Sequence, residues 1–407
     1  MIKNYLLLIL RNFSRRKLRG WLTILGILIG IAAVVALISI AQGLQDSIAR
    51  QFEKMGTNKL IIMPGSGGAF FGAFAGTMLT EKDLSVVKNA EGVDIATEMF
   101  FKMGKIKFKD ETKTTYIIGF PTDDKDGMDI ILSMTGFEAE KGRQLKEGDR
   151  DKVVIGYRYW SGENAIFSKN IKLKDKVQIE GRDFEVVGLI KRIGNPEDDA
   201  QVYIPIKTAR EIFDESDEIT YIYVQTKEGY TPNKVAEIIK KDLRDSRDEK
   251  EGEETFSVQT FEQLMAQFNQ ILGVVGSVLV IIALISLIVG GIGIMNTMYT
   301  SVLERTREIG IMKAVGAKNW QIMWLFILES GFYGVIGGAI GVALGFAMGK
   351  AGELVAASAG YPILKVAFPL WLIFGSLLFA FLVGAISGLA PARTASRLKP
   401  VEALRYE

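Results

Sequence analysis

Four long apolar runs divide this chain of 407 residues. They cover residues 21–41, 271–298, 323–348 and 369–389. About 20 helical residues cross the hydrocarbon core of a bilayer, so each run predicts a transmembrane helix. The first run exceeds the roughly 7–15 apolar residues of a signal peptide. It also begins only after twenty residues, which favours an uncleaved anchor.

Helical periodicity continues outside the apolar runs. Residues 1–18 place several apolar side chains on one helical face and basic side chains elsewhere, which predicts an amphipathic helix on the cytoplasmic membrane surface. Apolar stripes also follow the first run and precede the second, and we interpret these two continuations as a helical stalk. The stripe residues are Leu44, Ile48 and Phe52 after the first run, and Phe261, Leu264 and Phe268 before the second.

The segment between the first two spans follows a different pattern. Strands are predicted over 58–63, 94–109, 113–120, 152–156, 176–179, 184–190, 218–225 and 255–259. Helices are predicted over 80–89, 157–164, 205–213 and 231–247. Strands mixed with helices in this order predict an α+β domain.

The placement of charge sets the expected topology. Residues 1–42 hold six Lys or Arg and no acid, and the segments 301–320 and 391–407 are also basic, whereas 349–368 holds two Lys. Short cytoplasmic loops are enriched in Lys and Arg, so we expect both termini and 301–320 in the cytoplasm, with 43–270 outside. The predicted fold class is an α-helical membrane protein of the cell membrane, with four transmembrane helices plus a large α+β extracytoplasmic domain on a helical stalk.

The expected domains follow from these spans. They are an amphipathic helix (1–18), the first span with its stalk helix (19–56), the extracytoplasmic domain (57–260), the second stalk helix with its span (261–299), a cytoplasmic helix (300–319), the third span (320–349), an outer loop (350–368), the fourth span (369–390) and a cytoplasmic tail (391–407).

Residues 64–78 interrupt the α+β pattern with the sequence PGSGGAFFGAFAGTM. A Gly-rich segment of this kind is most simply a disordered loop. Phe70, Phe71 and Phe74 also allow a hydrophobic tip that contacts lipid or a partner.

Composition removes most catalytic chemistry. The chain has no Cys and no His, so it cannot build a thiol nucleophile, an imidazole base or a zinc cage, and we expect no catalytic and no metal site. A phosphate-binding P-loop needs the pattern GxxxxGK[ST], and neither Gly-Lys pair, at 104–105 or at 349–350, is followed by Ser or Thr. We therefore expect no cofactor in this chain and no ATP site of its own.

Small residues recur four positions apart within the spans. Such rows let helices approach closely in lipid, either within one subunit or at a sliding or dimeric face, and the sequence does not separate these cases. The residues are Gly26 and Gly30, then Gly337, Gly341 and Gly345, and finally Gly384 and Gly388.

Glu329 is an ionisable residue well inside the third span. A charge there is costly and is usually paired. It predicts either a proton or substrate site, or a tether to a polar group of the preceding span; we favour the tether because a single acid makes a poor proton relay.

The charged segment ERTREIGIMKAVGAKNWQI, 304–322, separates the second and third spans. Arg305 and Glu308 form an i, i+3 pair on its polar side, as do Glu304 and Arg307. Ile309, Met312 and Val315 form an apolar stripe, and Gly316 can end the helix. A short cytoplasmic helix with an apolar stripe is typical of a segment that docks in a groove of another protein.

The sequence of this segment resembles the E-x-x-REIGI-x-KA-x-GA signature of FtsX-like permeases. The tail PARTASRLKPVEALRYE resembles the C-terminal sequence of the same superfamily. The four spans, the length and the large domain after the first span resemble the MacB branch. The resemblance covers essentially the whole chain. The full-length bacterial exporters of this family carry an ATPase domain in the same polypeptide, so it implies a separate ABC ATPase partner for this chain.

The resemblance implies a homodimeric ABC permease, with ATP and Mg bound by a dimer of the partner ATPase. Its coupling helix corresponds to Glu304, Arg305, Arg307, Glu308, Ile309, Met312, Lys313, Val315 and Gly316. The outer domain is expected to divide into a porter-like part, 57–125 with 215–260, and an inserted small subdomain, 126–214. Whether an adaptor or membrane fusion protein takes part stays open. The expected surroundings are the lipid bilayer, without nucleic acid.

The sequence is compatible with two functions. The first is the permease of a mechanical exporter of peptides, lipoproteins or amphipathic toxins or antibiotics. The second is a non-transporting, FtsX-like regulator that controls an extracellular partner such as a wall hydrolase. The size of the outer domain favours the exporter, whereas the lack of His, Cys and paired acids in a span disfavours a membrane enzyme.

Overall fold

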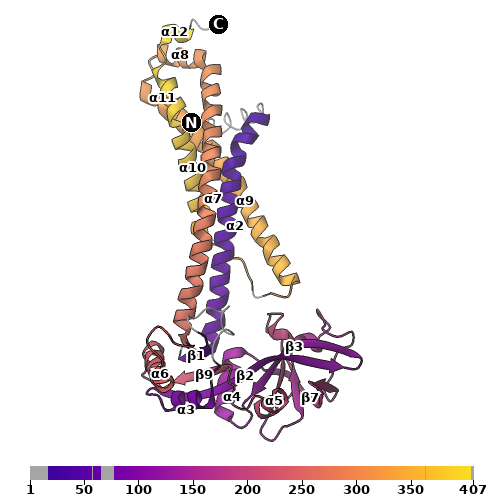
Figure 1. Ribbon diagram of the computed structural model, residues 1–407. Coiled ribbons are helices and arrows are strands. Elements are labelled where there is room, and N and C mark those ends of the chain that lie inside the picture. Colours follow the sequence, from indigo (N-terminus) through magenta and orange to yellow (C-terminus); the bar gives the residue numbers. More distant parts are fainter. Residues whose placement is uncertain (1–16, 57, 66–77, 363, 405–407) are drawn as a thin grey trace. The chain divides into compact units, whose positions relative to one another are not determined.

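A computed structural model describes residues 17–56, 58–65, 78–362 and 364–404 (Figure 1). The predicted amphipathic helix 1–18 and the residues Phe70, Phe71 and Phe74 lie outside the described residues, except for the last two positions of that helix. The chain divides into two compact units. The helical unit comprises residues 1–45, 270–355 and 364–407, and the β-rich unit comprises 46–269 and 356–363.

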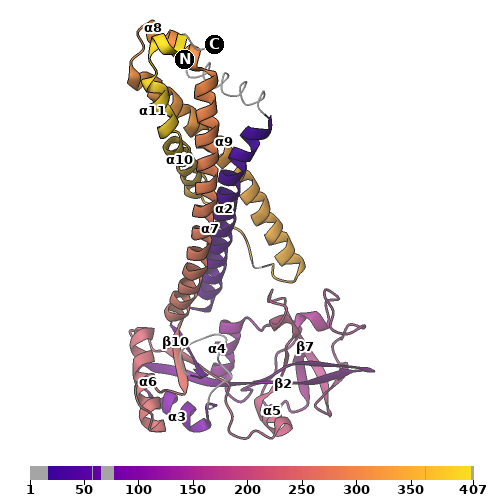
Figure 2. The same ribbon diagram turned by 45° about the horizontal axis from the view of Figure 1, so that its top comes forward.

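Among the residues that the structure describes, four helices are long and apolar enough to cross a membrane. The first three contain the predicted apolar runs and the fourth covers its run except for residues 369, 388 and 389. The first two continue without a break into the segments that we interpret as a stalk (Figures 1 and 2). The four helices are α2 (Lys17–Met55), α7 (Phe261–Glu304), α9 (Asn319–Ser358) and α10 (Leu370–Ser387). The shorter helices α8 (Thr306–Ala314), α11 (Leu389–Arg397) and α12 (Pro400–Leu404) also belong to the helical unit.

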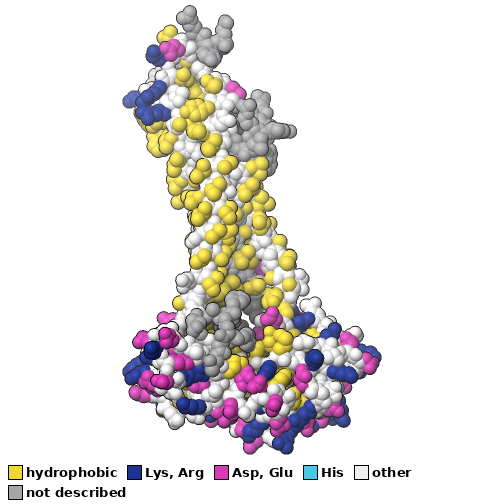
Figure 3. Space-filling view, viewed as in Figure 1, with side chains coloured by type: hydrophobic (Ala, Val, Ile, Leu, Met, Phe, Trp, Pro, Cys, Tyr) yellow, Lys and Arg dark blue, Asp and Glu magenta, His cyan; other side chains and the backbone are white. Residues whose placement is uncertain are grey.

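The outer surface of these long helices is apolar. Val274, Ile281 and Ile288 of α7 are each more than half exposed, and hydrophobic side chains cover the surface of the helices in Figure 3. Water would penalise such a surface, whereas hydrocarbon would not. The helical unit is therefore built to lie in lipid.

Close helix contacts in this unit are made through glycine. A Cβ added at Gly26 of α2 would lie 2.6 Å from the backbone of Gly290 of α7, and one at Gly384 of α10 would lie 2.5 Å from the carbonyl oxygen of Ser330 of α9. Gly341 and Gly345 of α9 approach α2 in the same way. These glycines of the predicted rows thus lie at contacts inside one chain, where the absence of a Cβ lets two helices meet closely.

The β-rich unit is organised around a ten-stranded sheet with the order β10-β1-β9-β2-β3-β8-β5-β7-β4, with β6 pairing with β2 and β7. Eight strands lie where the alternating pattern predicts them, and β4 and β8 were not predicted. The strands are β1 (Lys59–Pro64), β2 (Val93–Phe108), β3 (Glu111–Phe120), β4 (Ala139–Gly142), β5 (Lys152–Ile155), β6 (Lys176–Ile179), β7 (Arg182–Ile190), β8 (Val202–Pro205), β9 (Tyr221–Thr226) and β10 (Phe256–Thr260).

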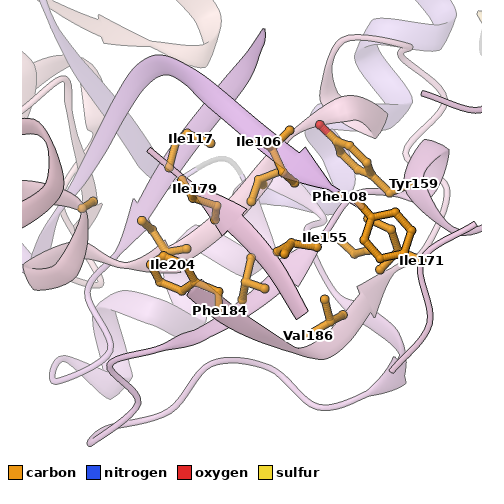
Figure 4. Close-up of a cluster of buried hydrophobic side chains, with 14 of the residues drawn as sticks. Ile106, Phe108, Ile117, Ile155, Tyr159, Ile171, Ile179, Phe184, Val186 and Ile204 are labelled. Atoms are coloured by element: carbon orange, nitrogen blue, oxygen red, sulfur yellow. The ribbon is translucent and has the colours of Figure 1, made fainter. Parts of the chain in front are cut away.

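Separate hydrophobic cores lie along this sheet. One packs α3 (Glu81–Asn89) and α6 (Pro232–Arg247) on β1, β9 and the start of β2. A second packs α5 (Ile206–Phe213) on the far end of β2 and on β3, β5, β7 and β8; its side chains, among them Ile155, Phe184 and Val186, gather in Figure 4. A third lies beneath α4 (Lys125–Thr135). The second core takes in Phe100, Ile106, Phe108 and Ile117, which we had assigned to the porter-like part rather than to the inserted subdomain.

Two expected elements differ from the structure, and one helix was not expected. The helix predicted over 157–164 is only the 3₁₀ turn Tyr157–Tyr159, and α4 was missed. The predicted outer loop 350–368 begins inside α9, which continues to Ser358. Its extra turns, GKAGELVAAS, consist mostly of good helix formers, so the helix continues after the apolar run ends.

Candidate coupling site at helix α8

The site begins at a sharp corner of the backbone. Helix α7 ends at Glu304, α8 starts at Thr306, and Arg305 between them has φ −104° and ψ 14°. The Thr306 hydroxyl donates to the carbonyl oxygens of Val302 at 3.1 Å and Leu303 at 2.8 Å. A side chain that bonds back to the preceding turn in this way commonly bends a helix. The chain therefore changes direction here without leaving those carbonyl groups unsatisfied.

The other end of α8 is a tight turn. The amide of Val315 donates to the carbonyl oxygen of Ile311 at 3.0 Å, and Gly316 follows with φ +106°. Glycine adopts this conformation without steric cost and commonly ends helices. Helix α9 begins three residues later, so α8 is confined between two spans.

One side of α8 is buried against the C-terminal part of the chain. Ile309 is 0% exposed and belongs to the core of the helical unit, and Met312 packs partly against that core. The Lys313 ammonium donates to the carbonyl oxygens of Ser396 at 2.6 Å and Leu398 at 2.7 Å, which ties α8 to the end of α11. Burial lowers the pKa of Lys313 below its ordinary value.

This burial corrects the expected docking stripe. We predicted that Ile309, Met312 and Val315 would face a partner together, but Ile309 is buried within the chain, and Lys313 bonds to the C-terminal segment. The reason is that α11 and α12 lie against α8 and cover its most apolar side. Val315 alone of the three is fully available, being 86% exposed.

The opposite side of α8 carries the surface that remains free for a partner. Arg307, Ile311 and Val315 are exposed and are spaced i, i+4, i+8, so they form one helical stripe, with Glu308 beside it. Ile311 is 50% exposed. We call Arg307, Glu308, Ile311 and Val315 the docking stripe. Val401 of α12, a helix in contact with α8, is also exposed.

Arg305 joins the corner to α9. Its guanidinium lies 2.9 Å from the carboxylate of Glu329 and 3.0 Å from that of Glu308, and over the ring of Phe326. Burial opposes the charge of Arg305, but the attraction and hydrogen bonds of Glu329 and Glu308 together outweigh it, so the pKa of Arg305 lies above its ordinary value. The tether expected for Glu329 exists, although its partner is a cation and not an uncharged polar group of the preceding span.

The remaining predicted residues lie outside this site. The side chain of Phe52 is not described, and the other stalk residues, Leu44, Ile48, Phe261, Leu264 and Phe268, are half-buried along α2 and α7. Sequence reasoning missed Ile311 and Val401. The signal for Ile311 was its spacing four residues before Val315, but a helical pattern alone does not show which of its faces the tail covers.

Two family models match the chain. The MacB-like periplasmic core domain matches residues 21–242, and the FtsX-like permease C-terminal family matches residues 280–400. The second match includes α8, Arg305 and Glu329.

Named relatives match over nearly the full length. An uncharacterised ABC transporter permease of Methanocaldococcus jannaschii, MJ1507, is 37% identical over 98% of this chain and 96% of its own length. The uncharacterised ABC transporter permease YknZ of Bacillus subtilis is 30% identical over 98% of each chain. The macrolide export ATP-binding/permease protein MacB of Campylobacter fetus is 30% identical over 96% of this chain but 59% of its own length. Among solved structures, the periplasmic region of MacB from Actinobacillus actinomycetemcomitans aligns with a TM-score of 0.43, 18% identity and coverage of 56% of this chain and 97% of its own.

Proposed function

This chain belongs to the family of ABC transporter permeases with a MacB-like periplasmic core domain and an FtsX-like C-terminal part, and from that premise we propose that it couples a separate ABC ATPase to motion of its β-rich unit. The ATPase dimer would bind ATP and Mg and would dock on the docking stripe. In this proposal two copies of the chain form the permease, with both termini and α8 in the cytoplasm.

The observation that carries this proposal is the docking stripe. Residues 305–318 separate two spans, and one side of α8 is buried by contacts with the C-terminal part of the same chain. The other side keeps two exposed aliphatic side chains, Ile311 and Val315, beside Arg307 and Glu308. Exposed aliphatic groups rimmed by charges on a short helix fit a groove in a folded partner.

Continuous helices support the second half of the proposal. Helix α7 runs for 44 residues and contains residues of both units, as does the 39-residue α2. Neither helix contains proline, a common cause of sharp kinks, and we propose that each carries a displacement along its length. We propose that this motion drives export of peptides, lipoproteins or amphipathic compounds. The FtsX-like regulator would use the same coupling, and it would differ in that ATP hydrolysis responds only to an outer protein partner.

Docking is tested by co-purification with the ABC ATPases encoded in the same genome. Val315→Asp and Ile311→Asp place a charge in the groove and are expected to weaken binding at least tenfold. Thr394→Asp is the matched control, because Thr394 is exposed on α11 away from the docking stripe. Retained binding by both stripe variants would rule out this docking surface. Ile309→Asp is unsuitable, because it would disrupt the core of the helical unit.

A further inference from the structure

Arg305 occupies a position that the coupling proposal does not itself explain. It is the single residue between α7 and α8, and its side chain contacts three residues on two elements: Glu308 on α8, and Glu329 and Phe326 on α9. The backbone around it keeps its helical bonds, since the amide of Arg305 donates to Ser301 at 3.1 Å and the amide of Ile309 donates to Arg305 at 3.0 Å. These bonds and those of the Thr306 hydroxyl are local to the corner, whereas the Arg305 side chain also reaches α9.

Glu329 supplies the fixed end of this contact. It is 7% exposed and lies on α9, ten residues after that helix begins. Among the side chains that the structure describes in the helical unit, it is the only buried ionisable one. A buried carboxylate that loses its partner is strongly unfavourable, so the position of Glu329 in α9 dictates where the Arg305 guanidinium must lie.

Geometry makes Arg305 suited to this task. A guanidinium is planar and presents several N–H donors in a rigid fork, so it can hold two carboxylates at defined angles. Here Nη1 faces Glu329 and Nε faces Glu308, with the ring of Phe326 beneath at 5.5 Å. The Arg305 side chain therefore links α8 to α9 and restrains the direction in which α8 leaves α7.

We infer that Glu329 is a positioning residue: through Arg305 it fixes the α7–α8 corner and so aims the docking stripe. It does not carry protons or substrate. Loss of the pair frees α8 to change its direction, although its buried side still packs on the tail. The inference rests on the proposed function where it assigns the docking stripe to an ATPase. The restraint of α8 by Arg305 and Glu329 can be measured on the permease alone.

The test uses a spin label on the full chain in nanodiscs without any ATPase. The chain has no Cys, so Val315→Cys gives a single labelling site on the docking stripe. Continuous-wave electron paramagnetic resonance then reports how freely α8 moves. Glu329→Gln and Arg305→Gln are each expected to raise the mobile fraction at least twofold. Arg305→Lys, which keeps the charge without the planar fork, is expected to lie between them and the wild type.

Controls separate this restraint from a general loss of stability. Glu353→Gln removes the Lys350–Glu353 pair of the same helix α9, at 2.8 Å, and should leave the spectrum unchanged. The double variant Arg305→Gln/Glu329→Gln should be no more mobile than either single variant, because both remove the same interaction. It also avoids an unpaired buried charge, so it decides the question if Glu329→Gln or Arg305→Gln fails to fold.

An unchanged spectrum in the folded Glu329→Gln or double variant overturns the inference, as does an additive effect in the double variant. Neither result affects the docking proposal, which depends on ATPase binding by the Val315 and Ile311 variants. Conversely, loss of the docking proposal leaves the spectroscopic result intact. The two ideas therefore fail independently.

Discussion

The β-rich unit and the helical unit of this chain bury and expose opposite kinds of side chain. The β-rich unit closes its apolar residues into cores and covers its surface with ion pairs, among them Arg182 with Asp151 and Glu211. The helical unit exposes many of its aliphatic side chains and places glycine at its internal contacts. Figure 3 shows charge gathered over the first unit and apolar groups over the second.

The difference follows from the solvent of each unit. In water, burial of apolar area stabilises a fold by roughly 25 cal/mol per Å², so apolar side chains turn inward. In hydrocarbon this gain disappears, because lipid is as apolar as Leu or Ile, and helices associate through close van der Waals contact. The comparison teaches that buried charge pairs should be sensitive contacts of the β-rich unit, whereas a single added methyl group should be a sensitive change between the spans.

The largest effect is expected at the Arg247–Asp83 pair of the β-rich unit. Asp83 is 2% exposed and accepts two bonds from Arg247, at 2.9 and 2.6 Å. Burial opposes its ionisation, but the bonds and charge of Arg247 together with the bonds from Thr80 outweigh this, so the pKa of Asp83 lies below its ordinary value. Arg247→Met leaves a buried charge unpaired and should lower the local free energy of unfolding by about 3–5 kcal/mol. Hydrogen exchange in α3 and α6 of the detergent-solubilised chain measures it.

A matched control tests whether burial is the cause. Lys191 and Glu138 form an ion pair of the same unit, but both side chains are about half exposed. Lys191→Gln should cost no more than about 0.5 kcal/mol. Equal effects of Arg247→Met and Lys191→Gln would contradict the role assigned to buried pairs in this unit.

The next effect concerns glycines of α10. Gly384→Ala places a Cβ 2.5 Å from the carbonyl oxygen of Ser330 and 3.1 Å from Gly334, so the two helices must separate. Overpacking of this kind costs about 1–3 kcal/mol. Gly375→Ala in the same helix has no neighbour within 4 Å and should be neutral or slightly stabilising. Thermal unfolding of the two variants in detergent measures the difference. An unfolding temperature of Gly375→Ala below that of Gly384→Ala would contradict the role assigned to close glycine contacts.

Sequence patterns predicted most helices and strands of both units but missed some short elements of the β-rich unit. The spans and eight strands followed from apolar runs and from alternation, because those periods reflect the backbone geometry itself. Helix α4 escaped notice because it begins after Asp123 and Asp124 and contains Gly127, which together look like a turn. The short strands β4 and β8 lack an alternating pattern, because β4, with the sequence AEKG, buries none of its side chains fully, whereas β8, with the sequence VYIP, is buried throughout.

The sequence predicted the helix of the candidate site, but not which of its faces is buried. Its helix and its Arg305–Glu308 pair follow from local spacing, and the latter lies at 3.0 Å. The buried face could not be foreseen, because it depends on Lys313 bonding to carbonyl groups 83 and 85 residues away. The Arg305–Glu329 pair likewise joins residues on two helices whose relative rotation no single-helix pattern contains.

The smallest predicted effect depends on pH and belongs to the β-rich unit. Asp198 is half-buried in the turn before β8, and burial raises its pKa to about 6, with Asp199 and Glu197 adding repulsion. Its partners are the side-chain amides of Asn195 at 3.0 Å and Gln201 at 2.9 Å. The folded-state pKa is above the unfolded value near 3.9, so the stabilising contribution is full below about pH 4 and is lost as pH rises through about 6.

Raising the pH from 4 to 7 should therefore weaken this turn by on the order of 1 kcal/mol, and Asp198→Asn should remove that dependence. Hydrogen exchange of peptides covering 193–205, corrected for the intrinsic effect of pH, measures the change. Peptides from β1 and β9, which belong to the other core of the same unit, should show no difference between Asp198→Asn and the wild type. A pH dependence that persists in Asp198→Asn would assign it to another group, with Asp199 the nearest, since burial also raises its pKa.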